Sequence, residues 1–116
     1  VTWGGMVPRA LKGAELSGKS VEVIDLRTIS PWDKEAVFAS IRKTSRCMIV
    51  HEDNFTAGFG AEIAAVLADE CFFELDAPIA RVTMPDVPSP HHPTLLNAVV
   101  PTPEKISAEI TKLLEV

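Results

Sequence analysis

The sequence predicts an α/β fold, in which a mostly parallel sheet is covered by helices on both faces. The first sign is the short apolar run Cys47–Val50, which is typical of a strand buried on both faces. The second is the glycine-punctuated turn Thr56–Gly60, which leads into a helix of Ala, Ile, Val and Leu over Glu62–Cys71. The third is the alternation of strands and helices along the rest of the chain, which is typical of a parallel sheet.

The N-terminal segment predicts one strand and one helix. Val1–Trp3 is expected to end a first strand, and Gly4 and Gly5 terminate it. A helix should follow, because Pro8 is tolerated near a helix start and Gly18 suits the position just past a helix end. The buried face of this helix is expected to contain Val7, Leu11 and Ala14.

The β-branched segment Val21–Leu26 predicts a second strand. The next helix is expected to begin with Ser30 as its N-cap and Pro31 as its first residue, a combination that favours a helix start. The spacing of its apolar residues predicts one buried face, formed by Val37, Phe38 and Ile41.

The C-terminal part predicts one more strand, Ile79–Met84, after the turn Asp76–Pro78. The segment 85–93 contains four prolines. Proline has a fixed φ and no N–H donor, so this segment is expected to form an extended, rigid loop. The last helix should begin near Pro103, and its apolar stripe consists of Ile106, Ile110, Leu113 and Leu114.

Composition and charge limit the class of protein. The chain has 116 residues, 47% of them hydrophobic and 23% charged, which predicts a single globular domain over residues 1–116. A net charge of −5 argues against binding to nucleic acid or to an anionic membrane surface. The apolar start Val1–Trp3, without Met, suggests a fragment of a longer protein. Cys47 and Cys71 lie in apolar elements and are expected to be buried free thiols.

The turn Gly58–Gly60 before a helix could hold a phosphate group through free N–H groups and the helix dipole. It matches neither the dinucleotide-binding nor the P-loop pattern. Glu52 and Asp53 precede it and would repel an anion. We therefore favour a packing role for the two glycines and keep an independent ligand-binding α/β domain as the alternative.

The segment His51–Asp53 could supply a catalytic base with carboxylates, as in a hydrolase, but no nucleophile is identifiable beside it. We favour a polar cluster at a strand end that contacts another subunit or domain. His51, His91 and His92 could bind a metal, although their spacing matches no compact zinc motif. We therefore assign no catalytic, cofactor-binding or metal-binding residue to this chain.

Four motifs occur in a characteristic order and spacing. They are EVIDLRTISPWD at 22–33, HE at 51–52 with GFGAEI at 58–63, LDAPI at 75–79 with RV at 81–82, and the spaced residues Asp86, Pro88 and Pro90. In this order they resemble the C-terminal domain of the beta subunit of the thiamine-diphosphate-dependent component of 2-oxo acid dehydrogenases. This domain belongs to the transketolase C-terminal domain family. The His51–Glu52 pair is more similar to branched-chain than to pyruvate dehydrogenases.

The resemblance implies a three-layer α/β/α sandwich with a mixed, mostly parallel five-stranded sheet, whose first strand begins a few residues before Val1. It implies an enzyme of the bacterial cytoplasm or mitochondrial matrix that decarboxylates a branched-chain 2-oxo acid or pyruvate and transfers the acyl group to a lipoyl group. Thiamine diphosphate and magnesium would be bound elsewhere in the full enzyme. The implied partners are an alpha subunit or alpha-like domain, a second beta subunit and the subunit-binding domain of the lipoyl acyltransferase.

Two surfaces are expected to contact these partners. Phe55 is a large apolar residue in a polar loop, which is typical of an interface anchor. The expected subunit interface consists of His51, Glu52, Phe55, Phe59, Asp86, Pro88 and Pro90. The acyltransferase is expected to dock on acidic groups, namely Glu74, Asp76 and the terminal carboxylate of Val116. Glu115 and that carboxylate would oppose the dipole of the last helix, which favours a cationic partner there.

Overall fold

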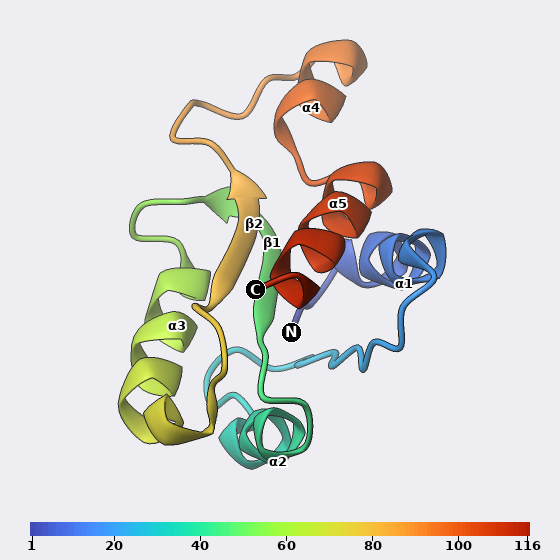
Figure 1. Cartoon of the computed structure of the whole chain (residues 1–116). Coiled ribbons are helices and arrows are strands. Elements are labelled where there is room, and N and C mark those ends of the chain that lie inside the picture. The colour runs from blue at the N-terminus through green and yellow to red at the C-terminus, as the bar shows by residue number, and fades with distance from the viewer.

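The computed structural model describes all 116 residues. The chain contains five α-helices, one short 3₁₀ helix and two β-strands (Figure 1). In chain order they are α1 (Met6–Ser17), α2 (Lys34–Thr44), β1 (Met48–Asn54), α3 (Phe59–Glu70), η1 (Phe72–Glu74), β2 (Ala80–Met84), α4 (Pro93–Val99) and α5 (Pro103–Leu114).

The sheet consists of β1 and β2, which pair in parallel with Met48 opposite Ala80 and Val50 opposite Val82. Thr2 forms isolated parallel bridges to Val50 on one side and to Asp25 on the other. The parallel arrangement confirms part of the prediction. The five strands of a complete mixed sheet are not present in the structure. The expected strand at 21–26 is reduced to a single bridge because most of its backbone has no neighbouring strand.

Helices cover both faces of the sheet and enclose two apolar cores. One core joins β1 to α2 and α3 and includes Val37, Ile41, Ile49, Ile63 and Leu67. The other joins β1 to α1 and α5 and consists of Met6, Val50, Ile106 and Ile110. The two cores separate because consecutive side chains of a strand, here Ile49 and Val50, point to opposite faces. The expected α/β fold with helices on both faces is therefore confirmed (Figure 1).

Two details of the first helices were predicted wrongly. α1 begins at Met6, and it buries Met6, Ala10 and Gly13, while Leu11 is 54% exposed. The buried face is shifted because α1 packs closely against α5 through the small residue at position 13. α2 begins after Asp33, whose carboxylate accepts a hydrogen bond from Ala36 N at 3.0 Å, so Asp33 rather than Ser30 is the N-cap.

The C-terminal elements follow the prediction more closely. α5 begins at Pro103 and buries Ile106 and Ile110, while Leu114 at its end is exposed. The proline-rich loop continues into α4, a short helix with Pro93 as its first residue. Cys47 and Cys71 are buried and free, as expected. None of the helices has both the length and the hydrophobicity of a membrane-spanning segment.

Candidate interaction surfaces

All candidate residues except His51 and Phe59 lie at the two ends of the strands. Glu52, Phe55, Asp86, Pro88 and Pro90 follow β1 or β2 or lie at the end of β1, and we call them the carboxyl-end surface. The second group, Glu74, Asp76 and Val116, is called the amino-end surface. Glu74 and Asp76 precede β2 in the chain. Val116 O accepts a hydrogen bond from Arg46, which lies just before β1. The structure therefore separates the residues assigned to different partners.

His51 does not belong to either surface. β1 continues to Asn54, and the His51 side chain is only 1% exposed, so the expectation that polar residues begin a surface at position 51 was wrong. Its ring stacks on Trp3 with centroids 5.3 Å apart, and its Nδ1 atom accepts a hydrogen bond from Asp53 N at 3.2 Å. Burial lowers the pKa of His51, because the charged imidazolium is poorly solvated there. The neutral ring of His51 is therefore buried between β1, Trp3 and the start of α3.

The Nε2 atom of His51 has no hydrogen-bond partner. Because Nδ1 accepts a hydrogen bond, Nε2 carries the proton, and it faces the backbone of Gly60. A Cβ atom at Gly60 would lie 2.2 Å from Nε2, and one at Gly58 would lie 2.2 Å from Asn54 O. The two glycines are thus explained by close packing, and no space is left at Nε2 for a substrate. This geometry argues against both the hydrolase and the phosphate-binding hypotheses.

Phe55 lies on the surface and is held there by Arg81. Its side chain is 46% exposed, and the Arg81 guanidinium carbon lies 3.7 Å from the centre of its ring. Arg81 Nη1 also donates a hydrogen bond to Phe55 O at 2.9 Å. Sequence reasoning missed this role, although a charged residue in the middle of an otherwise apolar strand was a usable signal. The contact presents Phe55 in a fixed orientation.

Asp86 connects the loops that follow β1 and β2. Its carboxylate accepts hydrogen bonds from Thr56 N at 2.8 Å and from Thr56 Oγ1 at 2.5 Å. These bonds, with the Thr56 hydroxyl as the main cause, lower the pKa of Asp86. Asn54 Nδ2 adds hydrogen bonds to Pro85 O at 2.8 Å and to Val87 O at 3.1 Å. The carboxyl-end surface is therefore a single connected unit.

The other residues of this group differ in exposure. Glu52 and Pro88 are exposed, whereas Pro90 is half-buried. Phe59, at the start of α3, is half-buried and packs edge-on against Trp3 with ring centroids 5.7 Å apart. His91 and His92 are exposed before α4, apart from the buried His51, and no group of three potential metal ligands is present. Phe59 thus belongs mainly to the supporting layer, together with His51.

The amino-end surface is organised around the segment before β1. Ser45 O accepts a hydrogen bond from Asp76 N at 2.8 Å, which holds Asp76 on the surface with its side chain exposed. The next residue, Arg46, donates to Leu113 O at 3.3 Å and to Val116 O at 3.0 Å. Ser45 and Arg46 therefore bring Asp76 and Val116 to the same end of the sheet.

Two of the expected anions have cationic neighbours. Glu74 Oε1 lies 3.9 Å from Arg42 Nε, and the side chain of Glu74 is half-exposed. The contacts of Arg46 with the last turn of α5 place a cation at that helix end, which is favourable for its dipole. Arg46 therefore offsets part of the negative charge that Glu115 and the terminal carboxylate place at the end of α5. Phe73, beside Glu74, is 95% exposed and adds an apolar contact point that sequence reasoning did not consider.

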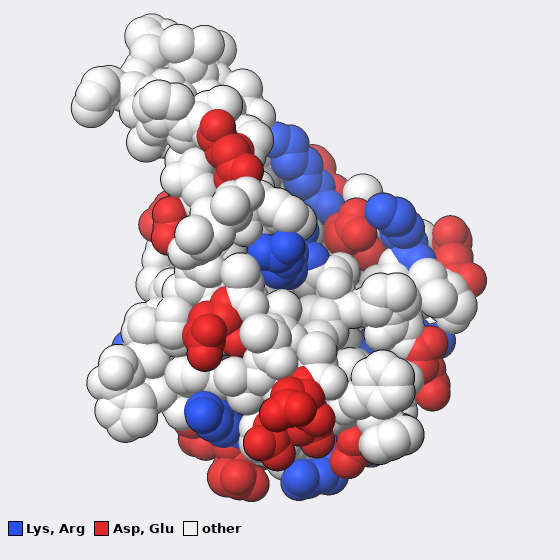
Figure 2. Space-filling model, turned by 90° about the vertical axis from the view of Figure 1, so that its left-hand side faces the viewer, with Lys and Arg blue, Asp and Glu red and all other residues white.

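Figure 2 shows how charge is distributed over the face that carries β2 and α3. The projecting lobe around α4 is free of charged side chains, because residues 87–103 contain no Lys, Arg, Asp or Glu. Acidic and basic side chains lie over the rest of this face. An uncharged lobe with exposed apolar residues such as Val87 and Leu95 is suited to contacts with other protein chains.

Together, the helices on both faces of a parallel sheet define an α/β domain, and its candidate residues form two exposed surfaces. Residues 1–106 match the family model described as "Transketolase, C-terminal domain". The chain therefore belongs to the transketolase C-terminal domain family.

Comparison with individual proteins agrees with this assignment. The chain is 42% identical over 116 residues to the 2-oxoisovalerate dehydrogenase subunit beta of Pseudomonas aeruginosa, covering 100% of this chain and 33% of that protein. It is 42% identical over 114 residues to the acetoin:2,6-dichlorophenolindophenol oxidoreductase subunit beta of Bacillus subtilis, covering 96% and 33%. A solved structure described as "Split gene transketolase, inactive beta4 tetramer" matches with a TM-score of 0.80 and 27% identity over 98% of this chain and 37% of its own. The chain thus spans about a third of the length of these relatives.

Proposed function

We propose that this chain is the C-terminal assembly and docking domain of the beta part of a thiamine-diphosphate-dependent 2-oxo acid dehydrogenase. The observation that carries this proposal is the match of the whole of this chain to part of a 2-oxoisovalerate dehydrogenase subunit beta, at 42% identity over 116 residues. The complete enzyme would oxidatively decarboxylate a 2-oxo acid and pass the acyl group to the lipoyl group of an acyltransferase. It would work in the bacterial cytoplasm or in the mitochondrial matrix.

A branched-chain 2-oxo acid is the proposed substrate. Relatives from Pseudomonas aeruginosa and Bacillus subtilis, at 42% and 39% identity over essentially the whole chain, are named 2-oxoisovalerate dehydrogenase subunit beta. A relative from Leifsonia xyli named for pyruvate dehydrogenase is 42% identical over 93 residues, so pyruvate is the second candidate. The full-length protein, co-expressed with its alpha partner, should decarboxylate 2-oxoisovalerate with a higher kcat/KM than pyruvate. The opposite order would reject the branched-chain assignment.

Within that enzyme, this domain has no catalytic role in our proposal, and thiamine diphosphate and magnesium are held by other parts. The glycine turn before α3 is filled by the ring of His51 and is preceded by acidic residues. Calorimetric titration of the isolated domain with thiamine diphosphate and magnesium should therefore show no heat of binding. Micromolar binding would contradict this part of the proposal.

The carboxyl-end surface would contact an alpha subunit, an alpha-like domain or a second beta subunit. Its support is the fixed, half-exposed Phe55 and the connected loops around Asp86. Native mass spectrometry of the full-length protein with its partners tests the assembly. An α₂β₂ mass that is lost when Phe55 is changed would support the proposal, whereas a monomeric beta chain in the presence of alpha would reject it.

The amino-end surface would dock the basic subunit-binding domain of the acyltransferase. Asp76 is exposed, Glu74 is half-exposed, and the nearby aromatic Phe73 is almost fully exposed. Exposed charges of opposite sign mainly increase the rate of association, whereas a central aromatic residue contributes to affinity. The two surfaces lie at opposite ends of the strands, so both partners could bind at once.

A further inference from the structure

Phe72 and Phe73 form an exposed aromatic pair in η1, next to the carboxylates of the amino-end surface. Phe72 is 64% exposed and Phe73 is 95% exposed. Their rings pack edge to face, with centroids 5.2 Å apart and an interplanar angle of 87°. A phenylalanine side chain presents about 200 Å² of surface, so the pair exposes on the order of 300 Å². An apolar patch of this size on a soluble domain is often functional.

The pair is held in place by residues on both sides of it. Cys71 is buried, and its carbonyl group accepts a hydrogen bond from Glu74 N at 3.1 Å, which closes the turn. Leu75 packs against the core between α2 and α3, and Asp76 N donates to Ser45 O at 2.8 Å. η1 itself buries no residue. The two rings are therefore held at the surface by an anchored turn.

Carboxylates surround this pair in the sequence, namely Asp69, Glu70, Glu74 and Asp76. Glu74 has one cationic neighbour, because Arg42 Nε lies 3.9 Å from its Oε1 atom. Burial raises the pKa of the Cys71 thiol, the carboxylate of Glu74 raises it further, and Arg42 acts in the opposite direction. Glu70 and Glu35 add to the increase in this pKa. The charges around η1 are therefore mainly negative.

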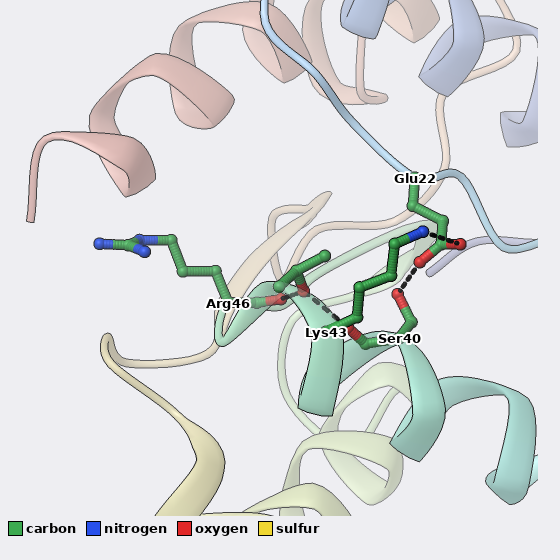
Figure 3. A network of polar contacts seen from close by, with 5 residues as sticks. Glu22, Ser40, Lys43 and Arg46 are labelled. Atoms are coloured by element: carbon green, nitrogen blue, oxygen red, sulfur yellow. Dashed lines mark hydrogen bonds and ion pairs between the residues drawn. The ribbon is translucent and has the colours of Figure 1, made fainter.

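Two further basic side chains near this end of the sheet, Lys43 and Arg46, are paired with other groups of the chain. Figure 3 shows Lys43 and Ser40 directed toward Glu22, whereas Arg46 points away from it. Lys43 Nζ lies 3.4 Å from Glu22 Oε1, and Ser40 Oγ donates to Glu22 Oε2 at 2.6 Å. Arg46 donates to two carbonyl groups at the end of α5. These cations therefore do not neutralise the carboxylates beside η1.

The chain contains its own example of a cation on an exposed phenylalanine. The guanidinium carbon of Arg81 lies 3.7 Å from the centre of the Phe55 ring. The second contact of this kind places Lys34 over Trp32. No Lys or Arg of this chain covers the pair in η1, although four carboxylates flank it. An open aromatic face beside carboxylates suits a guanidinium, because the ring attracts the cation and the carboxylates accept its N–H groups.

We propose that the aromatic pair in η1 binds an arginine side chain of the acyltransferase's basic subunit-binding domain, with the guanidinium stacked on the open face of Phe73. The inference rests on the proposed function for the identity of the partner, and it adds the chemistry of recognition. Arginine fits better than lysine, because the guanidinium is planar and weakly hydrated, whereas the ammonium group is compact and strongly hydrated. The pair controls the rate of dissociation, whereas the exposed charge of Asp76 steers the encounter.

Replacement of Phe73 by cyclohexylalanine, in the full-length protein with its alpha partner, tests the role of the aromatic ring. The saturated ring has nearly the same shape and apolar surface but no π electrons to attract a cation. Because Phe73 is 95% exposed, the variant should keep the fold. Its complex with the subunit-binding domain should dissociate roughly tenfold faster in surface plasmon resonance, with an unchanged association rate.

Trifluorophenylalanine at position 73 should also accelerate dissociation, because fluorine withdraws negative charge from the ring face. Unchanged or slower dissociation of both variants would identify a purely apolar contact and overturn the proposal.

Substitutions in the partner locate the guanidinium. The arginines of the subunit-binding domain are changed to lysine one at a time. One substitution should weaken binding to the unchanged protein about as much as the cyclohexylalanine does, and it should have little further effect on the cyclohexylalanine variant. Strictly additive losses for every arginine would show that none of them contacts Phe73, which would overturn the proposal.

Two control variants separate this inference from the proposed function. Leu11→Ala removes an apolar side chain of α1 that is 54% exposed, and it should change neither rate. Asp76→Arg should slow association by removing an attractive charge. If the unchanged protein does not bind the domain, the proposed docking fails and this inference fails with it. If Asp76→Arg slows association while the variants at position 73 dissociate at the normal rate, the docking stands and this inference alone fails.

Discussion

His51 is the residue whose environment departs most from its chemical type. It is buried, stacked on Trp3, and without a partner at Nε2, which is costly for a polar group. The neutral ring nevertheless fills the space between β1 and the glycines at the start of α3. The cost is acceptable only while the ring stays uncharged.

The stability of the domain should therefore depend on pH near neutrality. The unfolded histidine has an ordinary pKa of about 6.5, whereas burial lowers the pKa in the folded state. Above the unfolded value both states are neutral and stability is complete. As the pH falls below that value, only the unfolded chain binds the proton, and stability decreases. Urea unfolding between pH 7.5 and 5.5 measures this, and His51→Gln should remove the dependence. An unchanged slope in the variant would assign the effect to other groups.

Gly60 tests the packing against the same ring. Ala at this position would place Cβ 2.2 Å from His51 Nε2, so Gly60→Ala should reduce the free energy of unfolding by about 1–3 kcal/mol. Gly5→Ala is a matched control, since its Cβ would meet only Glu52 Oε1 at 3.6 Å and its backbone is already helical. Chemical denaturation of both variants measures the difference. Equal effects would show that His51 can move aside.

Phe55 tests the carboxyl-end surface. Phe55→Ala removes the exposed ring beneath the Arg81 guanidinium, and in the full assembly it should weaken subunit association by roughly 2 kcal/mol, as expected for a central anchor. The isolated domain should lose little stability, because the ring is half-exposed. Sedimentation of the assembly and thermal unfolding of the domain measure the two effects. Loss of domain stability with unchanged dissociation would identify Phe55 as a core residue.

At the scale of elements, the contact between α1 and α5 depends on Gly13. A Cβ at this position would lie 2.6 Å from Ile106 Cγ2 and 3.0 Å from Pro103 O. The absence of a side chain lets the two helices approach closely. This close approach also explains why α1 buries Met6, Ala10 and Gly13.

Gly13→Ala should therefore destabilise the domain by about 1–3 kcal/mol, although Ala is the better helix former by about 1 kcal/mol. Combination with Ile106→Leu moves the branch away from Cβ and should recover part of the loss. A double-mutant cycle in urea gives the coupling between the two positions. If the two changes in the free energy of unfolding were strictly additive, α1 and α5 would move apart and the Cβ at position 13 would not contact the side chain at position 106.

The accuracy of the prediction from sequence differs between the secondary-structure elements. The strand β1, the helices α2 and α5 and the buried cysteines follow from apolar spacing, which the structure confirms. The N-cap at Asp33 was missed because Ser30 and Pro31 form a strong competing helix-start signal in the sequence. The strand at 21–26 was predicted from its β-branched residues, but a strand also requires a neighbour, and that information lies outside the segment.

For the candidate surfaces, the sequence predicted which residues are exposed better than it predicted which residues hold them in place. Phe55 and Asp76 are on the surface, as an exposed role requires. His51 was misplaced because a histidine after an apolar run resembles the end of a strand. The partners of these residues, Arg81 and Arg46, act over 26 and 70 positions in the chain, a range that local patterns do not reveal.

At the scale of the whole molecule, the two candidate surfaces differ in chemistry. The carboxyl-end surface adjoins the charge-free lobe of α4, where Leu95 is 59% exposed (Figure 2). The amino-end surface combines carboxylates with the exposed aromatic residues of η1. A lobe of the first kind favours a permanent interface, whereas charged groups around a small apolar centre favour a partner that binds and leaves.

Asp76 provides the test of the amino-end surface. Its backbone N–H is bonded to Ser45 O, and its carboxylate is exposed, so Asp76→Arg should keep the fold. The substitution changes the net charge from −5 to −3. Association with the basic subunit-binding domain should slow by roughly tenfold at low salt and become less sensitive to salt, because exposed charges are screened beyond about 8 Å at physiological ionic strength.

The control must make the same change of charge elsewhere. Glu15→Arg does so at the end of α1, where the side chain is exposed. In Figure 1, α1 lies on the opposite side of the sheet from α3, the helix that leads into η1. If charge close to Asp76 steers the acyltransferase, only Asp76→Arg should reduce the slope of the association rate against salt, as measured by surface plasmon resonance. Equal slopes for the two variants would indicate that net charge alone is responsible. An unchanged rate for Asp76→Arg at low salt, with native circular dichroism, would place the dock on another surface.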